Sequence, residues 1–314
     1  MTKVLYLSYD GMCDPLGGSQ VLPYLFGLAG RGHGISLISF EKRERSAEEK
    51  ADVAAACERE RIDWHPLTYH KQPPVLSAMY DVRRMRKLAE ELHRKNGFDL
   101  VHCRSYLPDM VGLRMKRRYG TRFLFDMRGF WADERVDGRI WSLSNPVLRA
   151  VYIYFKRREA EFFSEADHVV SLTETGRSIL LSRRPHPADG PPISVIPCCV
   201  DLEAFSPVAA EHRGTARREL GIMPDATVAA YLGSFGTWYM VDEMMDFFRV
   251  QLERAPDAVF LIISRDPAEE ILARASARGV PPDRLMIRSA SRTEVPKLAA
   301  AADYALFFIQ PVFS

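Results

Sequence analysis

The sequence predicts an α/β protein built on parallel sheets, and three observations lead to this prediction. Short apolar runs alternate with amphipathic stretches of helical length along the chain, which is the pattern of β-α-β units. The first run, at residues 4–9, is apolar at nearly every position, as expected of a strand buried on both faces. Each half also opens with a strand, a glycine-containing turn and a helix. We therefore expect two sheets flanked by helices.

The elements follow in a regular order. Gly97 and Gly120 each end a predicted helix, because glycine readily adopts the left-handed C-cap conformation. Asn145 followed by Pro146 is typical of a helix start. Strands are expected at residues 4–9, 35–40, 64–67, 100–103, 123–126, 168–172, 193–196, 228–232, 259–264, 285–287 and 304–308. Helices are expected after the first glycine pair, from 144 onward, and at 47–61, 81–95, 113–119, 175–181, 241–252, 268–278 and 294–301.

Composition limits the classes of function. The 314 residues suffice for two domains, and we expect an N-terminal domain at 1–206 and a C-terminal domain at 207–314. A net charge of +2 does not favour nucleic-acid binding. The five cysteines include no Cys-x-x-Cys pair, so neither a zinc site nor a disulfide framework is indicated. With no secretory leader or membrane-spanning run in the sequence, we expect a cytoplasmic protein.

A glycine-rich junction follows the first strand. Gly17 and Gly18 permit a tight turn with uncovered N–H groups, and Ser19 is the expected N-cap of the next helix. In α/β proteins such a turn commonly binds a phosphate or carboxylate. The alternative is a turn that simply needs glycine, and the sequence leaves both interpretations open.

The densest polar segment spans residues 126–134. It begins at the carboxyl end of a predicted strand, where open α/β sheets place their ligands. Asp126, Asp133 and Glu134 are candidate catalytic carboxylates, Arg128 is a candidate anion ligand, and Trp131 is a candidate platform for an acceptor sugar ring. The alternative is a surface loop with internal salt bridges.

His102 and Arg104 end the neighbouring strand. Two strand ends that converge on one crevice favour a shared site, so both residues join the catalytic candidates. A structural histidine is the alternative.

The second half opens with another glycine turn. Its backbone N–H groups and hydroxyls suit a phosphate, although the turn holds no lysine or arginine. The nearest cation is Arg265, which follows the next strand. The candidate donor-binding residues here are Gly233, Ser234, Gly236, Thr237 and Arg265.

Several motifs are absent from the sequence. No Gly-x-Gly-x-x-Gly follows the first strand, and the P-loop and the Gly-x-Ser-x-Gly elbow are missing, which argues against a nicotinamide dehydrogenase, a P-loop enzyme and a serine hydrolase. No Asp-x-Asp occurs, so no metal-chelated nucleotide sugar is expected. Basic clusters at 83–87, 114–118 and 151–158 suit either an anionic membrane surface or ordinary solvated helix faces, and the interspersed acidic residues favour the second.

In this order, the motifs resemble those of the GT-B-fold glycosyltransferases of family 4. The resemblance covers nearly the whole chain. The isoleucine-proline to aspartate-phenylalanine run is the most specific of its motifs. The motifs are DPLGGSQ at 14–20, RGH at 31–33, the 126–134 segment, VIPCCVD at 195–201 with FSP at 205–207, and LGS at 232–234.

The resemblance implies two Rossmann-like domains with an active site in the cleft between them. It implies transfer of a sugar from a nucleotide-sugar donor, usually with retention, without a metal or other cofactor. The acceptor is expected to be a saccharide or a lipid-linked saccharide, with peripheral contact at the inner face of the membrane as a further expectation. Gly17 and Gly18 would approach the donor, His102 and the 126–134 segment would serve the acceptor side, and the second half would bind the nucleotide.

The sequence departs from the family pattern at two points. The family's basic pair is not matched at 236–240, and no residue matches its acidic ribose-binding motif, so we expect an incomplete second domain. Apolar surface would then be uncovered around Phe307, Phe308, Ile309 and Phe313. A GT-B-like nucleotide-sugar epimerase and a non-catalytic interaction module are the alternative functions.

Overall fold

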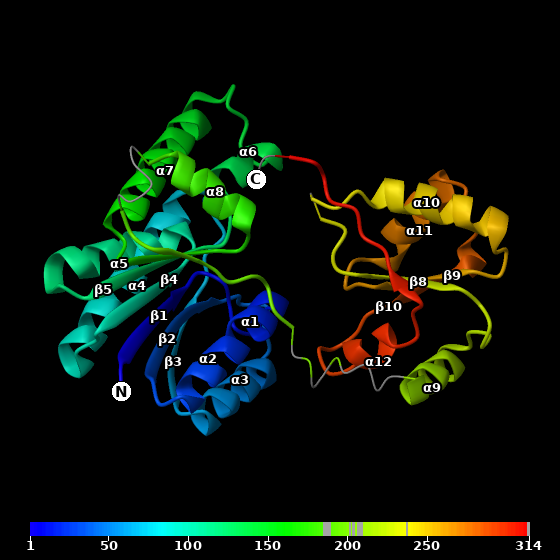
Figure 1. Ribbon diagram of the computed structural model, residues 1–314, viewed down its shortest axis with the longest axis horizontal. Helices are drawn as coiled ribbons and strands as arrows, with labels where there is room; N and C mark the ends of the chain where they lie inside the picture. The colour runs from blue at the N-terminus through cyan, green and yellow to red at the C-terminus, as the bar shows by residue number, and fades with distance from the viewer. Residues whose placement is uncertain (185–189, 201, 203–204, 206–209, 237, 313–314) are drawn as a thin grey trace. The chain divides into compact units, whose positions relative to one another are not determined.

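The computed structural model describes residues 1–184, 190–200, 202, 205, 210–236 and 238–312. The described chain divides into two compact units, Met1–Val200 and Asp201–Val312 (Figure 1). The predicted boundary between residues 206 and 207 lies outside the described residues.

The first unit is built on one parallel sheet. Within its described residues, seven strands lie in the order β3-β2-β1-β4-β5-β6-β7. The chain enters the sheet near its centre and crosses to the other side after β3, so the carboxyl ends of β1 and β4 are adjacent. The strands are β1 (Lys3–Ser8), β2 (Gly34–Glu41), β3 (Ile62–Thr68), β4 (Leu100–Arg104), β5 (Arg122–Met127), β6 (His168–Ser171) and β7 (Ile193–Val195).

Helices cover both faces of this sheet. One core cluster joins the sheet to α4, α5, α7 and α8, and a second joins its other face to α2 and α3. The predicted glycine stops are confirmed, because Gly97 and Gly120 are left-handed C-caps. The helices are α1 (Pro15–Gln20), α2 (Leu22–Gly30), α3 (Ala47–Arg59), α4 (Leu76–Asn96), α5 (Tyr106–Tyr119), α6 (Trp131–Asp137), α7 (Pro146–Glu165) and α8 (Glu174–Ser182).

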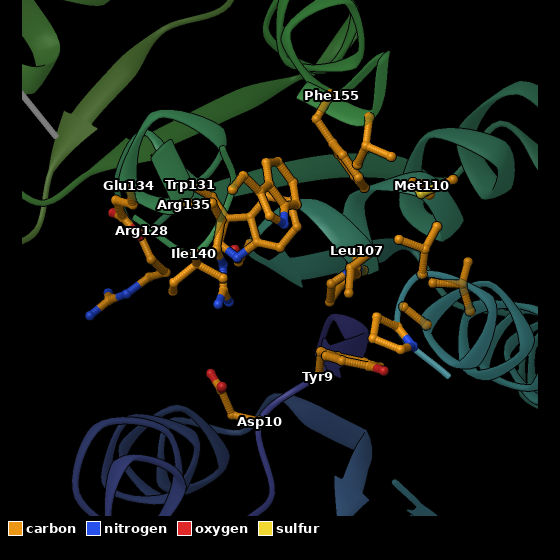
Figure 2. Close-up of a pocket in the computed structure, with 18 of the residues that line it drawn as sticks. Tyr9, Asp10, Leu107, Met110, Arg128, Trp131, Glu134, Arg135, Ile140 and Phe155 are labelled. Carbon is orange, nitrogen blue, oxygen red and sulfur yellow. The ribbon is translucent and has the colours of Figure 1, made fainter. Parts of the chain in front are cut away.

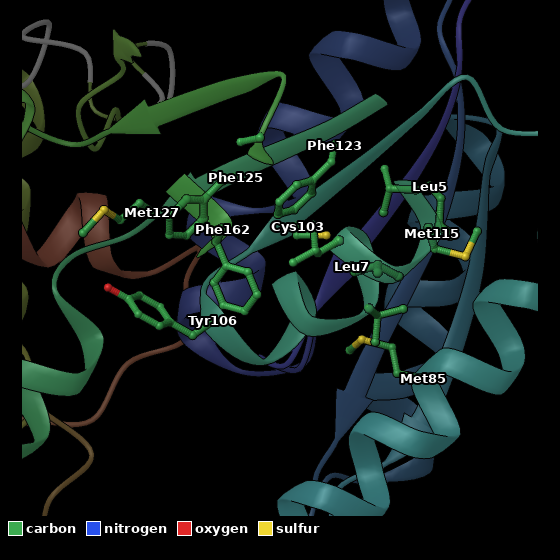
Figure 3. Packing of buried hydrophobic residues seen from close by; sticks show 14 of the residues in the cluster. Leu5, Leu7, Met85, Cys103, Tyr106, Met115, Phe123, Phe125, Met127 and Phe162 are labelled. Carbon is green, nitrogen blue, oxygen red and sulfur yellow. The ribbon is translucent and has the colours of Figure 1, made fainter. Parts of the chain in front are cut away.

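Aromatic rings fill the larger core. Phe125 of β5 packs edge-on against Phe162 of α7 and Tyr106 of α5 (Figure 3). All three side chains are fully buried. Interlocking rings of this size fix the position of α7 over β5, because close-packed cores tolerate little change in volume.

The segment after β1 differs from the prediction. Gly17, Gly18 and Ser19 lie inside the short helix α1, so the predicted bare turn and the predicted N-cap role of Ser19 are both wrong. Asp14 is the N-cap residue, and Pro15 is the first residue of the helix. Proline is tolerated there because a backbone N–H at the first helical position would have no partner within the helix. The Asp14 carboxylate binds Arg45 Nη2 at 2.6 Å instead of capping the helix.

A buried carboxylate fastens the loop between β1 and α1. Glu41, at the end of β2, accepts hydrogen bonds from the backbone N–H groups of Met12 at 2.8 Å and Cys13 at 3.1 Å. The Ser39 hydroxyl donates to the same carboxylate at 2.7 Å. Burial and the nearby Glu41 carboxylate raise the pKa of the Cys13 thiol to about 12.

The second unit repeats the α/β design on a smaller scale. Its described strands form a parallel sheet in the order β10-β9-β8-β11, with α10 and α11 on one face and α9 and α12 on the other. The elements are α9 (Ala210–Leu220), β8 (Val228–Leu232), α10 (Val241–Arg254), β9 (Val259–Ile263), α11 (Ala268–Ala277), the 3-10 turn η2 (Pro282–Arg284), β10 (Leu285–Arg288), α12 (Val295–Ala299) and β11 (Tyr304–Ala305).

The predictions missed or shortened several elements. Helices α6 and α9 were not predicted, and α5 begins well before the predicted residue 113 because Pro108 is tolerated in its first turn. The predicted exposure of Phe307 and Ile309 is confirmed, whereas Phe308 packs partly into the core beside Phe247. Phe313 lies outside the described residues.

Candidate functional site

A large cavity opens at the carboxyl ends of β1, β4 and β5 in the first unit. It has a volume of about 1500 Å³ and is bounded by α1 and by α4 to α7 (Figure 2). This is the edge of an open parallel sheet where ligands usually bind. In Figure 2 the charged side chains Asp10, Arg128 and Glu134 lie toward one side, and Leu107 and Met110 lie toward the other.

Two arginines lie at the charged side. Arg104, at the end of β4, is almost fully buried and donates from Nε to Asp10 Oδ2 at 3.1 Å. Arg128 donates from Nη2 to Gln20 Oε1 at 3.0 Å, so it links the strand end to α1. Both residues line the cavity, and their positive charges suit an anionic ligand.

His102 and Asp126 meet beside the cavity rather than in its wall. His102 Nε2 lies 3.3 Å from Asp126 Oδ2, and the imidazole packs on the Tyr6 ring at a centroid distance of 4.4 Å. Burial acts to raise the pKa of Asp126, but the hydrogen bond and charge of His102, with Arg128 and Arg104, outweigh it and lower this pKa. Asp126 is therefore an ionised carboxylate that orients His102 and Arg128.

Glu134 faces the cavity from α6. Burial, and to a smaller extent the charge of Asp133, raise its pKa, although Arg135 opposes this shift. A carboxyl group with a raised pKa is suited to proton transfer. Gly129 makes room for it, because an added Cβ there would lie 2.0 Å from Glu134 Oε1.

Asp133 lies elsewhere, although it precedes Glu134. Its carboxylate binds the Tyr152 hydroxyl at 2.8 Å and Lys156 Nζ at 2.7 Å, both on α7. Lys156 also binds the buried Glu159 at 2.6 Å. These bonds hold α6 against α7, so the salt bridge of Asp133 joins two helices and is not internal to the 126–134 segment.

Trp131 lies in the cavity wall, as an acceptor platform would require. Its indole packs against Phe155 at 4.8 Å and Trp141 at 5.2 Å between ring centroids. The Arg135 guanidinium lies 5.1 Å from the Trp131 ring centroid. One flank of the aromatic surface is therefore cationic.

A second polar group in the wall was not predicted. His70 Nδ1 lies 2.6 Å from Oδ1 of the fully buried Asp81, whose Oδ2 accepts a hydrogen bond from the Tyr9 hydroxyl at 3.1 Å. His70 and Tyr9 line the cavity. The sequence held no local signal for this group, because Asp81 reads as a helix residue and His70 as part of a proline-rich loop.

Gly17 of α1 has a packing role against the loop between β1 and α1. An added Cβ at Gly17 would lie 2.1 Å from the Gly11 carbonyl oxygen, so this glycine is needed where α1 packs on the preceding loop. The N–H groups of Met12 and Cys13 are already bound to Glu41. Donor binding by Gly17, Gly18 and Ser19 stays a prediction, while Leu16 and Gln20 of the same helix line the cavity.

The glycine turn of the second unit follows β8. The Phe235 N–H donates to Asp266 Oδ2, and the Tyr231 hydroxyl donates to the Ser234 carbonyl at 2.7 Å. Tyr231 also stacks on the Phe235 ring. These bonds fix the turn and occupy one of the N–H groups expected to bind phosphate. Gly233, Ser234, Gly236 and the exposed Arg265 stay predicted donor ligands, and Thr237 lies outside the described residues.

The basic cluster of α5 is largely neutralised. Arg114 and Arg118 pair with Glu90, and Arg117 pairs with Glu161 and Glu165. Solvated helix faces are therefore the better interpretation of this cluster. In the described part of the chain, no helix is long and apolar enough to cross a membrane. Among the same residues, no group of three histidine, cysteine or carboxylate side chains is arranged to hold a metal ion.

Comparison with known proteins identifies the family. A model of Glycosyltransferase Family 4 matches residues 22–204, more than half of the 314 residues. The chain belongs to glycosyltransferase family 4. A D-inositol 3-phosphate glycosyltransferase of Actinosynnema mirum is 27% identical to this family 4 chain over 183 residues, 57% of the chain and 38% of that protein. The chain spans about two fifths of the length of the curated relatives it matches.

Solved structures share the fold of the family 4 chain. Sucrose-phosphate synthase from Thermosynechococcus elongatus aligns with a TM-score of 0.68 and 16% identity, covering 97% of this chain and 75% of that one. HepE from Anabaena, solved in complex with UDP and glucose, aligns with a TM-score of 0.62 and 14% identity, covering 97% and 73%. At these identities the likeness shows the fold alone, and it confirms the predicted GT-B-like class with two parallel α/β sheets.

Proposed function

We propose that this protein transfers a sugar from a nucleotide-sugar donor to an acceptor held in the cavity of the first unit. The observation that carries the proposal is the convergence of Arg104, Arg128 and Glu134 on one cavity at the strand ends of a family 4 chain. The family also favours glycosyl transfer over the epimerase alternative. Retention of configuration, metal independence and a cytoplasmic location belong to the same proposal.

Each side chain has a proposed task. Arg128 positions a phosphate or sugar oxyanion by charge-assisted hydrogen bonds. The Asp126 carboxylate, paired with Arg128 at 3.7 Å, fixes the orientation of the Arg128 side chain. Glu134 accepts the proton that the acceptor hydroxyl loses as its oxygen bonds to the anomeric carbon and the nucleoside diphosphate leaves, because the raised pKa of Glu134 brings it closer to the operating pH. Trp131 offers an apolar face for the acceptor.

The test is turnover by the purified protein with radiolabelled UDP- and GDP-sugars and a panel of acceptors. Arg128→Ala should lower kcat/KM roughly 10- to 100-fold, because it removes a charged donor at the site. Arg118→Ala is the matched control. Arg118 is an exposed residue of α5 that pairs with Glu90 of α4, so its substitution should leave turnover unchanged.

Three outcomes would contradict the proposal. Interconversion of a free nucleotide sugar without acceptor would indicate the epimerase. The absence of both turnover and donor binding would indicate the interaction module. Equal turnover by Arg128→Ala and the wild type would show that the reaction does not take place in this cavity.

Two further measurements test the remaining parts of the proposal. Turnover in the presence of EDTA tests metal independence, and NMR of the product's anomeric proton tests retention of configuration.

A further inference from the structure

The cavity is unusually large and mostly apolar for a sugar site. Its volume of about 1500 Å³ exceeds the roughly 300–1000 Å³ of common small-molecule pockets. Faces of three helices supply most of the wall away from the arginines. These wall residues are Met79 and Val82 of α4, Leu107 and Met110 of α5, and Val147, Val151 and Phe155 of α7.

The apolar wall continues onto the surface. Met79 is 64% exposed and Val147 is 65% exposed, while Ile140 and Tyr154 are about half exposed. All four side chains line the cavity. Large apolar side chains gathered and exposed around one opening indicate a surface that a ligand covers.

The cations mark the other end of the same cavity. Arg128 lies with Asp10 and Glu134 at the charged side, and Arg135 lies over the Trp131 ring where the charged side meets the aromatic wall (Figure 2). An occupant that matches this surface has an anionic group at one end and a long hydrocarbon part at the other. A free saccharide would leave the apolar wall uncovered.

We propose that the cavity binds a lipid-linked acceptor, with its phosphate at Arg128 and Arg135 and its hydrocarbon chain along the wall formed by α4, α5 and α7. This inference rests on the proposed function and commits it to a lipid acceptor. The occupant's saccharide then lies next to Glu134.

The first test varies the length of the ligand's hydrocarbon chain. Octyl, decyl and dodecyl phosphate, each below its critical micelle concentration, are titrated against the purified protein by calorimetry. Each added methylene that is buried should tighten binding about fourfold, so each two-carbon step should tighten it about fifteenfold. Dodecyl maltoside, which lacks the phosphate, should bind more weakly than dodecyl phosphate, and Arg128→Ala should reduce that preference.

A matched pair of variants tests the apolar wall. Ala150 and Ala160 are exposed residues of α7, but only Ala150 is part of the cavity wall. Ala150→Asp should weaken dodecyl phosphate binding at least tenfold, whereas Ala160→Asp should not change it. Circular dichroism spectra of both variants should match the wild type, because both positions are solvated.

Tryptophan fluorescence shows where the hydrocarbon chain of the ligand binds. A 12-bromododecyl phosphate probe should quench Trp131 and Trp141, so the quenching should vanish in the Trp131→Phe/Trp141→Phe variant. It should persist in Trp64→Phe, because Trp64 packs in the core on the other face of the sheet.

The outcomes separate this inference from the proposed function. Equal affinity for all three chain lengths, or transfer to a soluble saccharide with unchanged kcat/KM in Ala150→Asp, would overturn the lipid acceptor and leave the transferase intact. A wild-type dimer that Ala150→Asp dissociates in sedimentation would also overturn it, since a second copy would then fill the cavity. Chain-length-dependent binding without any donor turnover would uphold the lipid site and overturn the transferase.

Discussion

Asp126 is buried at the end of β5 and joins residues from two strands. Its carboxylate lies 3.3 Å from His102 Nε2 and 3.7 Å from Arg128 Nη1. Because His102, Arg128 and Arg104 together lower the pKa of Asp126 despite its burial, the ionised form stabilises the fold. That contribution is complete above the pKa of an unfolded aspartate, about 4, and is lost as the pH falls through the lower folded pKa.

Asp126→Asn should therefore lower the free energy of unfolding by about 1–3 kcal/mol at pH 6. The gap between wild type and variant should shrink below about pH 4, as measured by urea unfolding from pH 7 to pH 3. Asp52→Asn, on an exposed position of α3, is the control and should change stability by less than about 0.5 kcal/mol. A gap for Asp126→Asn that stays constant with pH would contradict the assignment.

Neighbouring residues of α6 show why single-residue roles could not be predicted. Asp133 and Glu134 were indistinguishable as candidates in the sequence. Successive residues of a helix point about 100° apart, so Asp133 reaches Tyr152 and Lys156 on α7 while Glu134 reaches the cavity. The prediction did not include a helix here and therefore had no means of separating the two.

At the scale of the element, α1 and its loop carry the clearest correction. The sequence predicted uncovered N–H groups in a turn at Gly17 and Gly18, but the Gly18 N–H donates to the Asp14 carbonyl at 3.0 Å within α1. In the preceding loop, Glu41 from β2 accepts hydrogen bonds from the N–H groups of Met12 and Cys13. A contact between residues this far apart in sequence has no local signature. Gly17 is required by packing on the Gly11 carbonyl, whatever ligand the site binds.

Gly17→Ala should lower the free energy of unfolding by about 1–3 kcal/mol, because its Cβ would overlap backbone atoms. Gly27→Ala in α2 is the matched control: nothing lies within 4 Å of its added Cβ, and removing a helical glycine should stabilise the protein by up to about 1 kcal/mol. Thermal and urea unfolding of the two variants measure the difference. Equal free energies of unfolding for the two variants would contradict the prediction, because α1 would then have shifted to accommodate the added methyl group without loss of stability.

At the scale of the whole molecule, each unit buries its own pair of core clusters. Phe123 lies in a cluster of the first unit and Phe260 in a cluster of the second, and both are essentially buried. Multi-domain chains with separate cores commonly unfold in more than one step. The family and the presence of two parallel α/β sheets were predictable at this scale, because short motifs and strand and helix periodicity are local properties. The strand order within each sheet was not predicted.

Scanning calorimetry should therefore resolve two transitions. Phe260→Ala should lower the midpoint of one and Phe123→Ala that of the other, each losing roughly 3–5 kcal/mol of unfolding free energy. Each variant is the control for its counterpart. A single transition that both variants shift equally would contradict independent cores.

The sequence by itself determined the α/β class, most strand and helix positions, the glycine C-caps at 97 and 120, and the family, because apolar periodicity and short motifs are encoded locally. It also selected Arg104, Arg128, Glu134 and Trp131, since residues at the ends of parallel strands meet at one sheet edge. Only the tertiary structure showed that Asp133 binds α7 and that the Glu41 carboxylate binds backbone N–H groups of the loop after β1. It also showed that α4, α5 and α7 form an apolar wall beside the arginines. Those contacts join residues distant in sequence, and their partners are fixed by packing.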